Sequence, residues 1–148
     1  MKASNFELLD GYFEARQIKP AQPDHAEDRA RRLHRLRHRL EGLAATVFVE
    51  FEDYLNARLG ERVECYVDRH DGFDTDTPPC IGFRWGIQGG PLNSLVFAGS
   101  VETGQIHATW QCRRNGLRFH GDHTVDPSWA PQFVHAMLQE LVLQFAPV

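Results

Sequence analysis

The chain has 148 residues, of which 42% are hydrophobic and 24% charged, and its formal net charge is −4 at pH 7. This length suits one domain with a real hydrophobic core, and the composition is that of a folded soluble protein. The mildly acidic balance gives no reason to expect binding to nucleic acid or to an anionic membrane through bulk charge.

No apolar run approaches the length of a membrane span, and the N-terminal residues lack the apolar region of a signal peptide. The cysteines, Cys65, Cys80 and Cys112, match no metal-binding or redox spacing. We therefore expect reduced thiols in a cytoplasmic protein without a membrane partner, a cofactor or a metal.

The N-terminal third of the chain has helical periodicity. A short helix is predicted at about 5–17 and is followed by a proline-bracketed linker, so that 1–23 form one segment. A long helix is predicted over 24–60, with Gly60 as its C-terminal stop. Such a helix would be about 54 Å long, whereas a compact domain of this size measures about 38 Å across. We therefore expect it to bend near Gly42, to project, or to pack against a second subunit.

From residue 62 to residue 125 the apolar period changes to two, which predicts an antiparallel sheet. The strands after the first one are expected at 81–87, 92–101, 105–114 and 117–124, joined by short turns. A final helix is predicted over 126–146, with Asp126 as N-cap and Pro127 at the first helical position. The fold class is therefore α+β: a single domain over 1–148, with helices packed on one face of a five-stranded antiparallel meander.

Asn115-Gly116 is the strongest turn signal in the chain, and a two-residue turn at this point fixes the register of the last hairpin. The predicted opposing pairs are Arg114–Leu117, Arg113–Arg118, Cys112–Phe119, Gln111–His120, Trp110–Gly121, Thr109–Asp122, Ala108–His123 and His107–Thr124. A three-residue turn over 89–91 is expected to place Phe83 opposite Phe97 and Trp85 opposite Leu95. Together the turns predict one apolar face and one polar face.

The polar face is the predicted binding site. It has small residues in its middle and long polar ones at its rim, and the candidate binding residues are Arg84, Gln111, Arg113, Arg118 and His120. Because Arg113 and Arg118 oppose each other directly, they repel unless an anion or an acidic partner lies between them. The alternative is an ordinary solvated sheet face.

Two other clusters contain residue types that can bind a metal or phosphates. His107, His120 and Asp122 are a possible metal-ligand set, but the predicted register spreads them along the strands, so no metal site is predicted. Arg32, Arg35 and Arg39 belong to an arginine-rich stretch of the long helix, which could contact phosphates, an acidic protein or only water.

The chain has no nucleophile in a catalytic motif and no phosphate-binding glycine loop before a helix. We therefore expect a non-enzymatic binding or adaptor protein, chaperone- or regulator-like, that recognises an acidic protein or other anionic partner. The polar sheet face and the long helix would form the contact, in a homodimer. The alternatives are a nucleic-acid-associated protein using the arginine-rich helix over 29–39, and a small-ligand or metal-dependent enzyme with a pocket on the sheet face.

Overall fold

The computed structural model of this protein describes residues 23–72 and 77–147. The chain groups into two compact units, Met1–Arg31 and Arg32–Val148. In the first unit the described residues form the beginning of helix α2 (Pro23–Leu40), where Arg31 and Asp28 make an ion pair one turn apart. The predicted helix at 5–17 and its linker lie outside the described residues, and the single-domain assignment stays a prediction.

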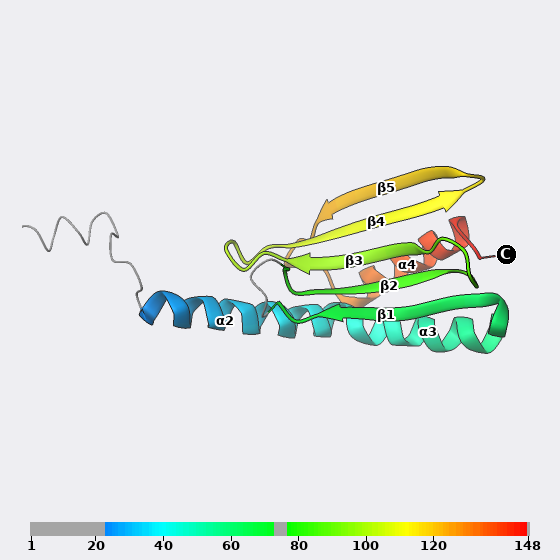
Figure 1. The fold of residues 1–148 in the computed structure, drawn as a ribbon. Coiled ribbons are helices and arrows are strands. Elements are labelled where there is room, and N and C mark those ends of the chain that lie inside the picture. The colour runs from blue at the N-terminus through cyan, green and yellow to red at the C-terminus, as the bar shows by residue number, and fades with distance from the viewer. Residues whose placement is uncertain (1–22, 73–76, 148) are drawn as a thin grey trace, which may run out of the picture. The chain divides into compact units, whose positions relative to one another are not determined.

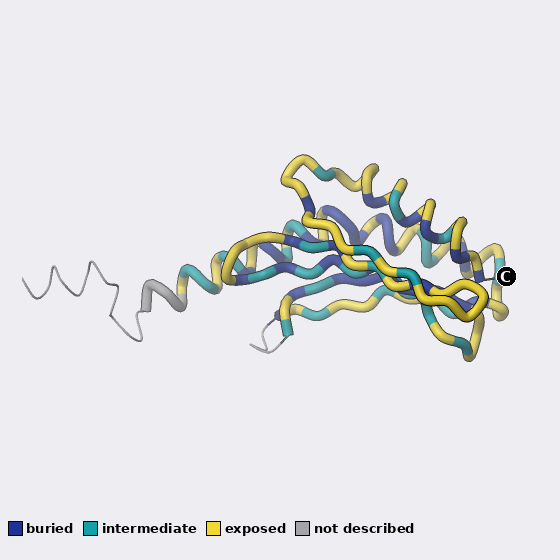
Figure 2. Tube along the Cα trace, turned by 90° about the horizontal axis from the view of Figure 1, so that it is seen from above, coloured by how far each residue is buried: buried dark blue, intermediate teal, exposed yellow. Residues whose placement is uncertain are grey.

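The second unit has the predicted α+β fold, with an antiparallel five-stranded sheet in the order β1-β2-β3-β4-β5. Its strands are β1 (Val63–His70), β2 (Cys80–Ile87), β3 (Asn93–Gly99), β4 (Ile106–Arg114) and β5 (Leu117–Thr124). Helices α3 (Thr46–Leu59) and α4 (Pro131–Gln144) lie on one side of this sheet (Figure 1). Buried residues concentrate between the helices and the strands (Figure 2). The prediction that helices cover one sheet face is therefore confirmed.

The long helical segment changes its winding where an irregularity was expected. Between α2 and α3 the backbone forms a π-helical stretch, η1 (Glu41–Ala45), which contains Gly42. A π turn holds one more residue than an α turn, so it rotates the apolar stripe that follows. Val47 and Phe48 are buried in the turn that follows, so α3 faces the core with a stripe rotated from that of α2. The helix ends at Gly60, whose φ of +58° favours glycine, and the short 3₁₀ helix η2 (Gly60–Arg62) leads into β1.

The core lies between the helices and the apolar sheet face. Phe83 and Phe97 are fully buried, and the ring of Phe48 lies 5.8 Å and 6.0 Å from them, centroid to centroid. Trp129, from the segment before α4, packs edge-on against Phe97 at 6.2 Å. The core therefore joins α3 and the approach to α4 to the centre of the sheet.

The register between β4 and β5 is as predicted for every pair from Arg114–Leu117 to His107–Thr124. Asn115 and Gly116 have φ values of +55° and +77°, as a type I′ turn requires. The predicted register between β2 and β3 is wrong by two residues, because Phe83 pairs with Leu95 and Trp85 with Asn93. The connection spans 88–92, and the N–H of Gly90 returns to the carbonyl oxygen of Ile87 at 2.8 Å. The β2–β3 pairing is therefore centred on residue 89 and not on residue 90 as expected, which shifts every partner by two positions.

The last helix begins later than predicted. Asp126 caps an isolated turn instead of α4, because its side chain accepts the N–H of Ser128 at 2.8 Å and its carbonyl oxygen accepts that of Trp129 at 3.0 Å. Ala130 is extended, with φ −124° and ψ 166°, since it precedes Pro131. A residue before proline is disfavoured from helical conformation, so the helix begins at Pro131.

Candidate functional site

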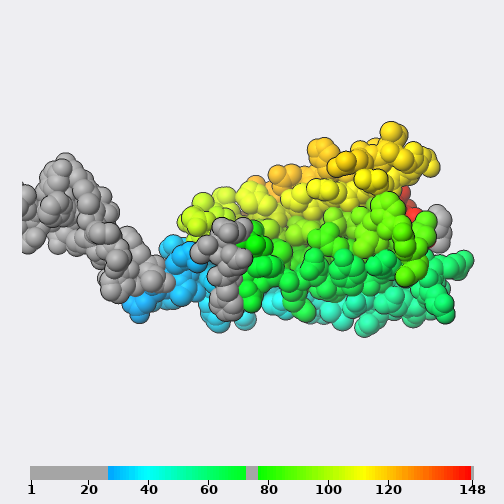
Figure 3. All heavy atoms as spheres, viewed as in Figure 1, coloured from blue at the N-terminus to red at the C-terminus, as the bar shows by residue number. Residues whose placement is uncertain are grey.

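The five strands align their polar side chains in rows across the uncovered sheet face. One row runs across the whole sheet through Tyr66, Arg84, Ser94, Gln111 and His120. Figure 3 shows this face with all strands at the surface and no helix in front of them. The predicted binding residues therefore share one accessible face.

Arg84 lies apart from the other candidates and already has a partner. Its Nε and its terminal nitrogen both lie 3.2 Å from a carboxylate oxygen of Asp68 on the neighbouring strand β1. Gln111 is two strands away from Arg84, which corresponds to about 10 Å. The charge of Arg84 is therefore balanced locally, and this residue does not join the site at β4 and β5.

The other four candidates come together at one end of the last hairpin. Gln111, Arg113, Arg118 and His120, called here the basic corner, line a cavity of about 230 Å³ with Pro91 and Leu92. Arg113 and Arg118 are opposed in the register and both exposed. Among the residues that the structure describes, no ion pair engages either guanidinium. The basic corner therefore carries two uncompensated positive charges beside a small cavity.

Strand β5 is an edge strand, so the backbone N–H and C=O groups of its successive residues point alternately toward β4 and toward solvent. Val125, just after it, donates its N–H to the carbonyl oxygen of Ile106 at 2.8 Å. In an antiparallel ladder every second residue points its N–H and C=O at the same neighbour. The odd-numbered residues of β5 therefore bond to β4, and Arg118, His120 and Asp122 direct their backbone groups outward. No described strand pairs with that outer edge.

A second, apolar groove lies on the opposite face of β5. It measures about 470 Å³ and lies between the sheet edge and α4, with Trp110, His123, Phe133 and Met137 among its lining residues. Phe133 is 48% exposed there, and its ring stacks near Trp129 at 4.3 Å. The edge strand thus has a basic site on one face and an apolar groove on the other.

Gly121 shapes this groove, because any side chain at its position would overlap the indole ring of Trp110 across the strand pair. His123 lies on the apolar face at the sheet edge, as its predicted pairing with Ala108 implies, and it is exposed beside the groove. No sequence pattern predicts this groove, because it forms only where α4 lies against the strands. The one related signal is that Phe133 and Met137 on α4 are accompanied by apolar residues on other sides of the helix, among them Val134, Leu138 and Val142.

The arginine-rich stretch of α2 binds neighbouring backbone groups more than it forms an exposed basic surface. Arg32 donates from Nε to the carbonyl oxygen of Val101 at 2.7 Å, and Arg39 donates to that of Asp126 at 3.1 Å. Arg35 is exposed. Two of the three predicted contact residues thus hold loops of the sheet layer in place, which leaves a weaker basic surface for a phosphate backbone than the sequence suggests.

The three candidate metal ligands do not point at one common position. The Nδ1 of His107 lies 3.5 Å from the hydroxyl oxygen of Thr124, and a carboxylate oxygen of Asp122 lies 3.5 Å from the hydroxyl oxygen of Thr109, each across the β4–β5 pair. His120 faces Gln111 instead. Within residues 23–72 and 77–147, no group of three histidine, cysteine or acidic side chains is placed to hold a metal ion.

The cysteines are poorly suited to nucleophilic chemistry. Burial raises the pKa of Cys112 to about 12, and burial together with the nearby charge of Glu52 raises that of Cys65 to about 11. Burial, with Asp68 as the second cause, also raises the pKa of Cys80. These thiols are therefore protonated at neutral pH, and the thiolate is the reactive form.

Comparison of the chain with known protein families, with curated proteins and with solved structures finds no match. None of the helices in the described part of the chain combines the length and apolar character needed to cross a bilayer.

Proposed function

We propose that this protein is a non-enzymatic binding or adaptor protein that captures an extended, acidic segment of a partner protein along β5. The segment adds to the sheet as a further strand, with its backbone bonded to the outward groups of Arg118, His120 and Asp122. This mode of recognition draws affinity from main-chain hydrogen bonds and specificity from alternate side chains.

One observation carries the proposal: two of the residues with outward backbone groups, Arg118 and His120, also hold their side chains in the basic corner of the polar face. An added strand has alternating side chains, so every second residue would lie beside Arg118 and His120. The residues between them would lie over the groove lined by Trp110, Phe133 and Met137. The favoured segment therefore alternates acidic with apolar residues.

The charge arrangement supports an anionic occupant at this end of the sheet. Arg113 and Arg118 repel each other across the strand pair, and a carboxylate of the added strand beside Arg118 offsets part of that repulsion. Arg84 contributes less, since Asp68 already balances its charge. The basic corner is therefore the part of the polar face that favours an acidic segment most strongly.

The test uses a fluorescein-labelled peptide of eight residues that alternates glutamate and valine. Fluorescence anisotropy with the full chain should show saturable binding. A peptide of the same composition with its glutamates and valines in two blocks should bind at least tenfold more weakly. Equal binding of the two peptides, or equal binding of a lysine–valine version, would contradict the proposal.

Two pairs of variants separate the parts of the site. Arg113→Glu combined with Arg118→Glu should abolish binding, whereas Arg62→Glu, an exposed charge reversal before β1, should leave it unchanged. His120→Pro removes one outward N–H at an edge position that tolerates proline, while His120→Val retains it. Binding should fall further in the proline variant, and circular dichroism should confirm that both variants fold. Equal losses would mean that only the side chain of His120 matters, which would contradict strand addition.

A further inference from the structure

A second surface lies on the outer side of α3, a helix that packs against β1, at the opposite edge of the sheet from β5. Glu50, Tyr54 and Arg58 project from α3 at intervals of four residues, so they lie on one stripe of this helix. All three are exposed, Tyr54 by 50%, and the guanidinium of Arg58 lies 4.9 Å above the Tyr54 ring. The stripe carries a negative charge at its beginning, an aromatic ring at its centre and a positive charge at its end.

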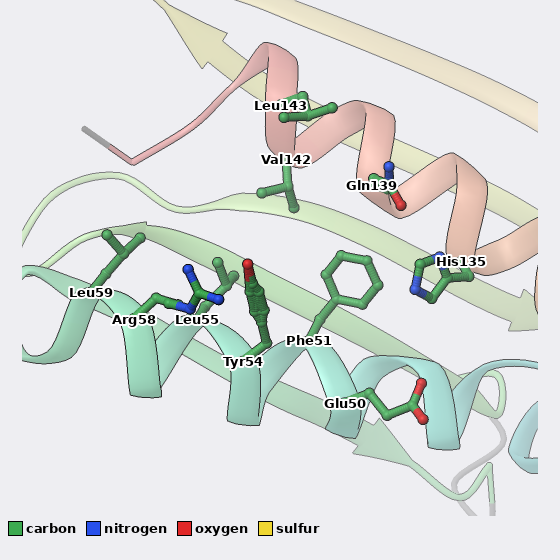
Figure 4. A pocket seen from close by; sticks show the side chains of 10 residues that line it. All are labelled: Glu50, Phe51, Tyr54, Leu55, Arg58, Leu59, His135, Gln139, Val142 and Leu143. Carbon is green, nitrogen blue, oxygen red and sulfur yellow. The ribbon is translucent and has the colours of Figure 1, made fainter.

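Beside this stripe, an apolar groove of about 830 Å³ separates α3 from α4. Figure 4 shows Phe51 and His135 close together at one end, where their ring centroids are 5.0 Å apart, and the two helices diverging from there. At the open end Leu143 is 72% exposed. No other helix or strand that the structure describes lines the groove. Exposed apolar surface of this kind marks an interaction site.

We infer that the occupant of this surface is a second copy of the chain, with the two α3 helices antiparallel about a twofold axis at Tyr54. The charge pattern is what commits the surface to this occupant. Glu50 and Arg58 are equally distant from Tyr54, about 6 Å along the helix on either side. The twofold axis therefore places Glu50 of each copy beside Arg58 of the other copy. The interface then contains this ion pair twice.

The same symmetry serves the groove and the aromatic ring. In a twofold interface each surface contacts its own counterpart, so the two Tyr54 rings meet at the axis and the open ends of both grooves are covered together. An acidic or a basic partner would instead leave one end of the stripe facing a like charge. Self-complementarity thus favours a homodimer over a foreign helix.

Sedimentation velocity of the full chain at micromolar concentration tests the dimer, and charge reversal tests its geometry. Glu50→Arg and Arg58→Glu should each raise the dimer dissociation constant at least tenfold, because each change makes both symmetric pairs repulsive. The double variant, with the two charges exchanged, should return to within about threefold of the wild type. Glu102→Arg, an exposed reversal outside the helices, is the matched control and should have no effect.

Mixing the two single variants gives the sharpest result. One chain then has arginine at both positions and the other has glutamate at both, so each of the two symmetric pairs joins an arginine to a glutamate. Equal amounts of Glu50→Arg and Arg58→Glu chains should form a heterodimer although neither forms a tight homodimer. A wild-type chain that is monomeric at this concentration would overturn the inference. A dimer unaffected by both reversals would place its interface elsewhere. Peptide binding at β5 depends on none of these residues.

Discussion

The indole Nε1 of Trp85 donates a hydrogen bond of 3.1 Å to the backbone carbonyl oxygen of Phe145, and so ties the end of α4 to strand β2. Asn93, which faces Trp85 across the β2–β3 pair, donates to the same oxygen at 3.2 Å. The side-chain oxygen of Asn93 accepts the N–H of Arg113 at 2.9 Å. A carbonyl that the end of a helix leaves unpaired is thus satisfied by two buried side chains. One of them also supports the strand that carries the basic corner.

Replacement of Asn93 by alanine should lower the free energy of unfolding by about 2 kcal/mol, since it removes two hydrogen bonds and leaves the N–H of Arg113 unpaired. Urea unfolding followed by tryptophan fluorescence measures the change. Gln132→Ala, at an exposed position in the first turn of α4, should stay within about 0.5 kcal/mol of the wild type. An Asn93→Ala chain whose urea unfolding midpoint equals that of the wild type would contradict this role.

Two glycines in open space should respond to alanine in opposite directions. Neither Gly116 nor Gly42 has an atom near the position that a methyl group would occupy. Gly116 has a φ of +77°, where alanine costs about 1–2 kcal/mol, so Gly116→Ala should destabilise the chain. Gly42 lies in the helical segment, where alanine gains about 0.5–1 kcal/mol. Thermal unfolding of both variants measures the difference, and a loss of stability in Gly42→Ala would be the unexpected result.

The sequence was sufficient to predict the faces of the sheet and the last hairpin, and the reason is the two-residue period of strands. The short Asn115-Gly116 turn leaves no freedom in counting, so the whole β4–β5 register follows from it. The β2–β3 connection allowed several loop lengths. A slip of two residues keeps every side chain on its own face, so the pattern of apolar residues could not reveal that Trp85 faces Asn93.

The site was predictable only in part, for a related reason. Register placed Gln111 beside His120 and Arg113 beside Arg118, because these are neighbours on one hairpin. The ion pair between Arg84 and Asp68 depends on the direction of two side chains across another strand pair, which periodicity does not fix. The grooves beside α4 depend on how a helix lies against a sheet, and no local pattern encodes that placement.

Arg32 and Arg35 offer a matched test of the arginine-rich helix, because they have the same side chain one turn apart. Arg32 is half-buried and bonded to the carbonyl oxygen of Val101, so Arg32→Ala should cost about 1–2 kcal/mol of stability. Arg35→Ala, at an exposed position, should stay within about 0.5 kcal/mol. Chemical denaturation compares the two variants. Equal effects would show that the hydrogen bond to Val101 contributes nothing to stability. Arg32 would then count as a surface charge that can contact a phosphate backbone.

The buried thiols should make stability fall in alkaline solution. In the folded chain burial raises the pKa of Cys112 to about 12, whereas an exposed thiol in the unfolded chain ionises near about 8.5. Between these values the unfolded state releases a proton that the folded state keeps, so the stabilisation is complete below the lower pKa and is lost as the pH rises above it. The urea midpoint of the wild type in reducing buffer should therefore decrease between pH 8 and pH 10.5.

The decrease should be smaller in Cys112→Ala, because that chain lacks the thiol. Tyrosines, lysines and the other two cysteines are present in both chains, so their titration cancels when the pH-dependent changes are compared. The alanine variant starts from a lower stability at pH 8, since Cys112 is only 2% exposed and its removal leaves a gap in the core. Only the difference between the two pH values is diagnostic. An identical decrease in both chains would show that Cys112 ionises as readily in the folded state as in the unfolded one.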